Sequence, residues 1–159
     1  MAGNINIEFE LNGKNVQAEI RPNLLLVDLL REQFGLTGSK IGCGMGECGA
    51  CTVMINSEPA NSCLILACRV HGQKVKTIEG LGENGKPSDL MKSFTEEGAV
   101  QCGFCTPGFI VSAEALLAEN PTPTKEEIRT ALSGNLCRCT GYLKIEQAVE
   151  KTARKRSEK

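Results

Sequence analysis

The chain has 159 residues, of which 41% are hydrophobic and only 4% aromatic, and its net charge at pH 7 is −1. This length fits one ordinary domain or two small ones, and the apolar content excludes a disordered chain. The scarcity of aromatic rings and of excess positive charge argues against binding of nucleic acid.

The first half of the chain predicts a small mixed sheet. Apolar and polar residues alternate at 5–11 and 16–20, which predicts two strands joined by the two-residue turn Asn12-Gly13. A helix is expected at 24–34, ended by Gly35. The other expected elements are a loop at 38–51, a strand at 52–55, a turn at 56–59, a short helix at 63–70 and a strand at 75–78.

The second half predicts four helices. Residues 79–87 contain three glycines and a proline, which indicates a linker. The helices are expected at 88–95, at 106–119, from the capping box at Thr124 to Gly134, and around Ile145. The basic end of the chain, including a tail at 156–159, is expected to be solvated and fraying. The predicted fold class is α+β.

Cysteine is the unusual residue, with nine copies against a single histidine. The N-terminus lacks an export signal, and no apolar run is long enough to span a bilayer, so we expect a cytoplasmic protein without a membrane segment. Stable disulfides are rare in that compartment, and an odd cysteine count fits a disulfide framework poorly. The cysteines are therefore expected to be thiolate ligands of metal.

The first cysteine set is Cys43, Cys48, Cys51 and Cys63. Its Cys-x4-Cys-x2-Cys spacing with a distant fourth cysteine is typical of a plant-type [2Fe–2S] cluster. Glycines in the same loop would let backbone N–H groups approach the sulfurs. Structural zinc prefers two tight pairs and fits less well. The loop also matches G-x-G-x-x-G, but a strand follows it rather than a helix, so a dinucleotide site is rejected.

The second cysteine set is Cys102, Cys105, Cys137 and Cys139. Both pairs lie beside predicted helix N-termini, which stabilise negative charge and so suit a cluster of thiolates and sulfides. Two tight pairs are also the habit of zinc, and the spacing alone leaves both metals open. The ninth cysteine, Cys68, is expected to be a buried core thiol, and His71 to lie at the surface.

Three segments carry a resemblance to a known family: 42–53 (GCGMGECGACTV), 101–108 (QCGFCTPG) and 134–142 (GNLCRCTGY). They resemble the small iron–sulfur subunit of the molybdenum hydroxylases, the family of xanthine dehydrogenase, aldehyde oxidoreductase and carbon monoxide dehydrogenase. The match extends over about residues 4–153, and every ligand position follows the family pattern.

The resemblance implies a β-grasp, ferredoxin-like domain at 1–78 and a four-helix domain at 88–155, each holding one [2Fe–2S] cluster. It implies a large molybdopterin-binding subunit and a medium FAD-binding subunit as partners, in a heterotrimer or a dimer of heterotrimers. Gln101 and Cys139 would contact the molybdopterin, and the plant-type cluster would lie nearer the FAD. Electrons would pass from molybdenum through both clusters to flavin.

Three functions are compared at this stage: an electron-transfer subunit of such a complex, a free-standing ferredoxin, and a zinc-stabilised interaction module. No acid–base pair or activated nucleophile is found outside the cysteines, so substrate chemistry is expected on another chain. A shuttle needs only one cluster, which disfavours the ferredoxin. The family uses purines, other N-heterocycles, aldehydes, aromatic acyl-CoA esters and carbon monoxide, and among these a purine or another N-heterocycle is favoured as the substrate of the complex.

Overall fold

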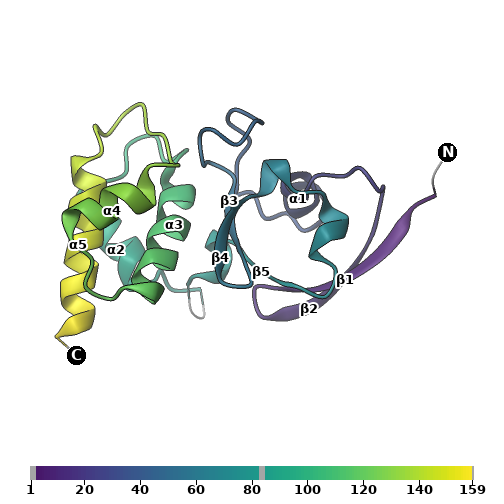
Figure 1. Ribbon diagram of the computed structural model, residues 1–159, viewed down its shortest axis with the longest axis horizontal. Coiled ribbons are helices and arrows are strands. Elements are labelled where there is room, and N and C mark those ends of the chain that lie inside the picture. Colours follow the sequence, from purple (N-terminus) through teal and green to yellow (C-terminus); the bar gives the residue numbers. More distant parts are fainter. Residues whose placement is uncertain (1–2, 83–84, 159) are drawn as a thin grey trace.

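The protein consists of a sheet unit followed in the chain by a helical unit, and the two lie side by side along the long axis (Figure 1). The structure is a computed structural model that describes residues 3–82 and 85–158. The predicted linker at 79–87 therefore lies partly outside the described residues.

The sheet has five strands in the order β2-β1-β5-β3-β4. The β1–β2 hairpin is antiparallel, β1 pairs with β5 in parallel, and β3 is antiparallel to both β4 and β5. The strands are β1 (Ile5–Leu11), β2 (Lys14–Ile20), β3 (Thr52–Ile55), β4 (Glu58–Asn61) and β5 (Lys74–Lys76).

Alternation along β1 determines which face meets the core. Ile7, Phe9 and Leu11 are buried, and the residues between them face outward. The ring of Phe9 meets Phe34 edge to face, with 5.8 Å between the ring centroids. The hairpin turn is at Asn12-Gly13 as predicted, and both residues adopt the positive φ that such turns require.

Two predicted helices of this unit are shorter and less regular than expected. The helix predicted at 24–34 is α1 (Leu26–Asp28), which continues as a π-helical turn over Leu29–Gln33. The helix predicted at 63–70 is two 3₁₀ turns, Ser62–Leu64 and Ala67–Val70. The chain is extended between them because Leu66 pairs with Leu25 in an isolated β-bridge.

The turn predicted at 56–59 is also shorter than expected. Asn56 and Ser57 both have positive φ and complete the reversal in two residues. Strand β4 follows immediately, and its Pro59 is tolerated because β4 is an edge strand.

The helical unit contains α2 (Asp89–Glu96), α3 (Thr106–Glu119), α4 (Lys125–Leu132) and α5 (Leu143–Ser157). Thr124 and Glu127 form the predicted capping box at the start of α4. The Thr-Pro sequence at 106–107 predicts Thr106 as the N-cap of α3, whereas the structure has Cys105 there, one residue earlier. None of the helices in the described ranges is long and apolar enough to cross a membrane.

The two units have separate hydrophobic cores and a shared boundary. One core gathers the sheet with α1, and the other gathers α2 to α5. Helix α3 packs against β3 and β4 and so joins the units. A 3₁₀ turn, Ile78–Gly80, overlaps the first residues of the predicted linker, and Ile78 and Leu81 pack against the helical core.

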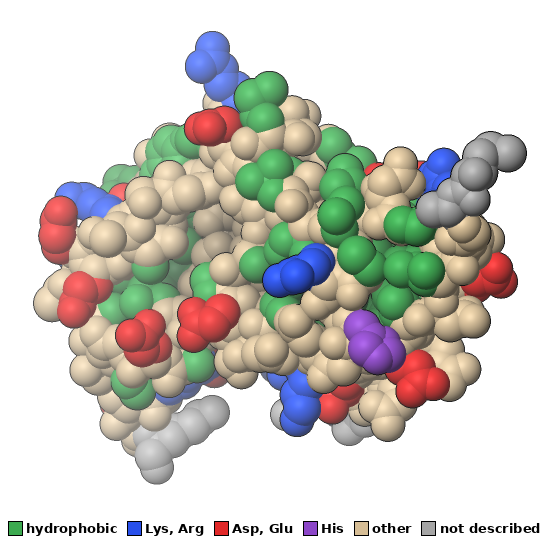
Figure 2. Space-filling view, turned by 45° about the vertical axis from the view of Figure 1, so that its right-hand side comes forward, with side chains coloured by type: hydrophobic (Ala, Val, Ile, Leu, Met, Phe, Trp, Pro, Cys, Tyr) green, Lys and Arg blue, Asp and Glu red, His purple; other side chains and the backbone are tan. Residues whose placement is uncertain are grey.

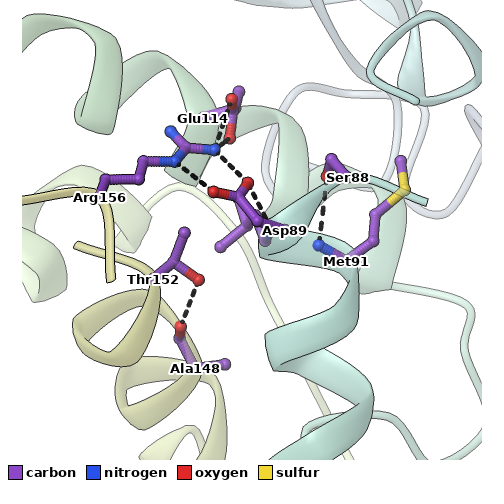
Figure 3. A network of polar contacts seen from close by, with 8 residues as sticks. Ser88, Asp89, Met91, Glu114, Ala148, Thr152 and Arg156 are labelled. Atoms are coloured by element: carbon purple, nitrogen blue, oxygen red, sulfur yellow. Dashed lines mark hydrogen bonds and ion pairs between the residues drawn. The ribbon is translucent and has the colours of Figure 1, made fainter. Parts of the chain in front are cut away.

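The basic end of the chain differs from the expected fraying terminus, because α5 is helical to Ser157. Arg156 donates hydrogen bonds to Asp89 of α2 and to Glu114 of α3 (Figure 3). Lys151 pairs with Glu97 at 2.6 Å between nitrogen and oxygen. Three positive charges that were expected in solvent, on Lys151, Lys155 and Arg156, are thus paired with acidic residues of neighbouring helices.

Candidate iron–sulfur centres

Backbone N–H groups surround the sulfurs of the first two cysteines in the loop before β3. The N–H groups of Met45 and Glu47 lie 3.4 and 3.3 Å from the Cys43 sulfur, and the Cys43 N–H lies 3.4 Å from the Cys48 sulfur. The Met45 N–H contributes most to lowering the pKa of Cys43 to about 7. Such donors stabilise negative charge on sulfur, as the sequence predicts.

The loop reaches this geometry through glycines of two kinds. Gly44, Gly46 and Gly49 have positive φ, where other residues are strained. Gly42 is needed for space, because a Cβ there would lie 2.8 Å from the Cys48 sulfur. The loop is therefore shaped to hold thiolates and leaves no room for side chains on its inner side.

The other two cysteines of the first set are buried. Cys51 precedes β3 and Cys63 lies in a 3₁₀ turn, and both pack against Val27 of α1. Burial raises the pKa of Cys51 to about 11, and the nearby thiol of Cys63 also raises it. Proton loss from such a thiol needs a compensating positive charge, which a metal centre supplies.

The second set lies where α3 begins and where the segment leading to α5 passes it. Cys102 and Cys139 are exposed, with 3.8 Å between their sulfurs. Burial raises the pKa of Cys105 to about 12, and the neighbouring Cys137 thiol adds to the rise. Although burial also raises the pKa of Cys137, hydrogen bonds from Thr140 outweigh it and lower that pKa.

Thr140 and Tyr142 support the second set, and the sequence analysis assigned them no role. The Thr140 hydroxyl and N–H lie 3.0 and 3.3 Å from the Cys137 sulfur. The Tyr142 hydroxyl accepts the Cys137 N–H at 3.0 Å, and its ring meets Phe109 edge to face. Tyr142 holds an unusual φ of 69°, and its place in the GNLCRCTGY segment was the only signal of its role.

Gln101 and Cys139 are brought together by the structure. The side-chain nitrogen of Gln101 donates to the Cys139 carbonyl oxygen at 3.3 Å, and both residues are exposed. The amide oxygen of Gln101 has no hydrogen-bond partner within residues 3–82 and 85–158. It can therefore accept a hydrogen bond from a group outside this chain.

The donor sets fit two negatively charged clusters. All nine cysteines are free, and each set combines four thiols with N–H or hydroxyl donors aimed at sulfur. Within the described ranges, no three His, Cys, Asp or Glu side chains converge as a site for a single metal ion.

The remaining two residues of the sequence analysis stand apart from both sets. Cys68 packs against the core of the sheet unit, but it is only partly buried, whereas a buried thiol was predicted. The exposed His71 accepts the backbone N–H of Glu8 at its Nδ1, which is a local surface contact.

Both halves of the chain match known iron–sulfur families. Residues 9–72 match the family described as 2Fe-2S iron-sulfur cluster binding domain, and residues 77–150 match the [2Fe-2S] binding domain. The "Nicotinate dehydrogenase small FeS subunit" of Eubacterium barkeri is 56% identical over 145 residues, covering 91% of this chain and 92% of the relative. The chain belongs to the small iron–sulfur subunits of the molybdenum hydroxylases. Like other members, it is a non-catalytic electron-transfer subunit of an oxidoreductase and carries two [2Fe–2S] clusters.

Solved structures confirm the α+β, ferredoxin-like fold of the subunit. Quinoline 2-oxidoreductase from Pseudomonas putida 86 matches with a TM-score of 0.91 and 45% identity, covering 97% of this chain and 98% of that one. The aldehyde oxidoreductase from Desulfovibrio desulfuricans ATCC 27774 matches with a TM-score of 0.92 and 44% identity, covering 97% of this chain but 17% of that one. The match of residues 77–150 to a [2Fe-2S] binding domain bears on the zinc alternative that spacing left open, because this range contains the whole second set.

Proposed function

We propose that each cysteine set holds one [2Fe–2S] cluster. The first comprises Cys43, Cys48, Cys51 and Cys63, and the second comprises Cys102, Cys105, Cys137 and Cys139. The N–H groups aimed at Cys43 and the Thr140 donors aimed at Cys137 support this assignment. When bound, each cluster supplies reversible one-electron transfer, and the chain itself supplies ligands and hydrogen bonds.

Iron and sulfide content tests the ligand sets. Two clusters with four cysteine ligands each give about four iron and about four sulfide per chain. Serine replacement of any one of the eight ligands should remove half of the iron. Stoichiometric zinc, or half the expected iron in the unmodified chain, would contradict the assignment.

We also propose that the chain carries electrons from a molybdopterin site on a large subunit to FAD on a medium subunit. One observation carries this proposal: the two sets are adjacent, because the Leu136 N–H donates to the Cys48 carbonyl at 3.0 Å. The second set ends at the surface with Cys139 and Gln101, which are proposed to meet the pterin. The first set would then lie nearer the flavin, in a heterotrimer or a dimer of heterotrimers.

Exposed hydrophobic side chains support contact with partner chains. On one face of the molecule they gather in its upper and right-hand parts (Figure 2). Three of the exposed hydrophobic residues of the chain neighbour the cysteines in sequence: Met45 at 66%, Leu136 at 54% and Phe104 at 45% exposure. Apolar groups beside exposed cysteines are typical of surfaces that a partner covers.

Nine free thiols fit a reducing compartment, which supports a cytoplasmic location.

Substitution of Gln101 tests the electron route. In the assembled complex, Gln101→Ala should slow reduction of the clusters by substrate, because a pterin contact is lost. Iron content should stay unchanged, since no thiolate is altered, and an external donor should still reduce the flavin. Gln33→Ala, at an exposed glutamine of the sheet unit, is the matched control. Wild-type reduction rates in Gln101→Ala at full molybdenum occupancy would contradict the pterin contact.

The substrate of the complex is proposed to be a purine or another N-heterocycle. The names of the nicotinate and quinoline relatives support this class, whereas the aldehyde oxidoreductase match supports aldehydes as the second candidate. The purified complex is mixed anaerobically with nicotinate, xanthine or an aldehyde. The visible absorbance of the clusters should bleach only when the added compound belongs to the substrate class of the complex. Bleaching by the aldehyde alone would reject the N-heterocycle.

A further inference from the structure

A buried asparagine connects the two cysteine loops across the boundary between the units. Asn135 is 4% exposed, and its side-chain nitrogen donates to the Gly49 carbonyl oxygen at 3.1 Å. Its side-chain oxygen accepts the Ser112 hydroxyl of α3 at 2.8 Å. The orientation of the amide is determined by these partners, because a carbonyl oxygen can only accept.

The position of Asn135 in the chain places it between ligands of the two sets. Gly49 directly follows Cys48, and Leu136 separates Asn135 from Cys137. The Leu136 N–H also donates to the Cys48 carbonyl oxygen at 3.0 Å. Two successive residues of the second loop therefore hold two successive residues of the first.

Two glycines allow the two cysteine loops to approach each other closely at this polar contact. A Cβ at Gly108 of α3 would overlap the Gly49 carbonyl oxygen, and a Cβ at Gly49 would overlap the Asn135 amide. The boundary leaves no space for even a methyl group at either position. Packed cores resist such insertions, so a side chain here must move one loop away from the other.

We propose that Asn135 is a positioning residue that fixes the spacing between the two clusters. Electron exchange between two centres weakens steeply with distance, so the spacing sets how well the subunit conducts. Asn135 contacts neither set through sulfur, and it acts by holding the backbone of Cys48 beside that of Cys137. The inference rests on the proposed ligand sets.

Magnetic interaction between the two reduced clusters measures this spacing directly. The test uses the full chain with both clusters, reduced with dithionite and examined by low-temperature EPR. Asn135→Asp keeps the shape and the acceptor for Ser112 but loses the donor to Gly49. We expect the interaction of the wild type to be lost or clearly reduced, with the g values of each cluster and the iron content unchanged.

Further variants separate spacing from general stability. Ser112→Ala removes the bond that orients the Asn135 amide and should weaken the interaction less than Asn135→Asp. Gly108→Ala should weaken it by wedging the loops apart. Ile128→Val is the matched control, because Ile128 is fully buried in the helical core, away from the boundary. It should lower stability without changing the interaction.

Each contrary result overturns the inference. An unchanged interaction in Asn135→Asp would do so, as would an unchanged interaction in both Ser112→Ala and Gly108→Ala, and so would a wild type without any interaction. Loss of half the iron in Asn135→Asp would show that Asn135 is needed to hold a cluster rather than to space two. If the proposed ligand sets were wrong, the unmodified chain would have the wrong iron content, which is measured independently of the interaction between the clusters.

Discussion

Gly42 shows at the residue scale how a small residue can matter through space alone. Its Cβ position lies 2.8 Å from the Cys48 sulfur, well inside van der Waals contact. Gly42→Ala should therefore displace the Cys48 thiol and remove the first cluster while the second remains. Separate EPR signals of the two reduced clusters, with iron analysis, measure this outcome.

Gly134→Ala is the matched control for Gly42→Ala. A Cβ at Gly134 meets nothing within 4 Å, although this glycine also lies near a cysteine set. We expect both clusters in this variant. An intact first cluster in Gly42→Ala would show that the loop yields to the methyl group.

Cys68 provides a second residue-scale prediction. It packs against the sheet core, and its neighbours are apolar side chains rather than other thiols. Cys68→Ser should leave the iron content unchanged, whereas Cys63→Ser should lose the first cluster. Iron analysis of the two variants, purified in parallel, checks this, and loss of iron in Cys68→Ser would show that the ligand set is wrong.

At the same scale, the sequence indicates the candidate ligands more directly than the residues that surround them. Cysteine spacing and the glycines of the first loop are local signals, and donors to the Cys43 and Cys48 sulfurs lie where they indicated. Asn135 acts through a contact with Gly49, which is distant in the sequence. Tyr142 likewise contacts the distant Phe109. No periodicity or spacing encodes such contacts, so residue reasoning alone could not assign them.

At the element scale, the ion-pair network between α2, α3 and α5 anchors the C-terminal helix. Arg156 reaches Asp89 with two nitrogens and also meets Glu114, and the Asp89 carboxylate raises the pKa of Arg156 (Figure 3). Its side chain is 27% exposed, so solvent screens the pairs only in part. Networks with bidentate arginine stabilise more than isolated surface pairs do.

Arg156→Met keeps most of the apolar stem and removes the charge. We expect a loss of about 1–2 kcal/mol in the unfolding free energy, between the values for exposed and buried pairs. Urea unfolding followed by helical circular dichroism measures it, with Arg154→Met, at an exposed arginine of the same helix, as the control. A variant as stable as the wild type would mean that the network contributes nothing net.

The neighbouring ion pairs of Lys151 determine the pH at which the urea unfolding should be measured. Hydrogen bonds from Lys151 lower the pKa of Glu96 and of Glu97 from the ordinary 4.5. A lowered pKa in the folded state gives stability that is present above 4.5 and is lost as the pH falls below it. At pH 7 these pairs are fully formed, so the comparison isolates Arg156.

Elements were predictable where one local rule governs them. Strict alternation predicted β1, and the capping box predicted the start of α4. Strand β4 was missed because Glu58–Asn61 lacks alternation and forms only by pairing with β3. The helix predicted after Cys63 is interrupted by the bridge between Leu25 and Leu66, which is again a tertiary contact.

At the scale of the whole molecule, two separate cores meet at a narrow polar boundary. The sheet and helical cores share no buried residue. Cys137 belongs to the helical core, whereas Cys51 and Cys63 form a small buried cluster with Val27. The two cysteine loops meet at the boundary, where the Leu136 N–H donates to the Cys48 carbonyl oxygen. The sequence predicted two units from the change in pattern near residue 79. It could not predict their mutual placement, because the contacts of Gly49 with Gly108 and Asn135 join residues far apart in the chain.

This arrangement predicts that the two clusters assemble independently although their spacing is coupled. In the proposed second set, Cys137 would join the segment before α5 to Cys105, the N-cap of α3, and metal binding by separated ligands is coupled to folding. Cys137→Ala should therefore loosen the helical unit and remove the second cluster. The first cluster should remain, because its four ligands and the core around them belong to the sheet unit.

EPR of the dithionite-reduced variant gives the measurement, with helical circular dichroism as the report on the helical unit. Cys63→Ser is the reciprocal control and should retain the second cluster with full helicity. Loss of only the second cluster in Cys137→Ala, together with loss of only the first cluster in Cys63→Ser, would establish that the clusters assemble independently. Equal loss of both signals in Cys137→Ala would instead mean that the boundary through Asn135 and Leu136 is required to fold the first loop.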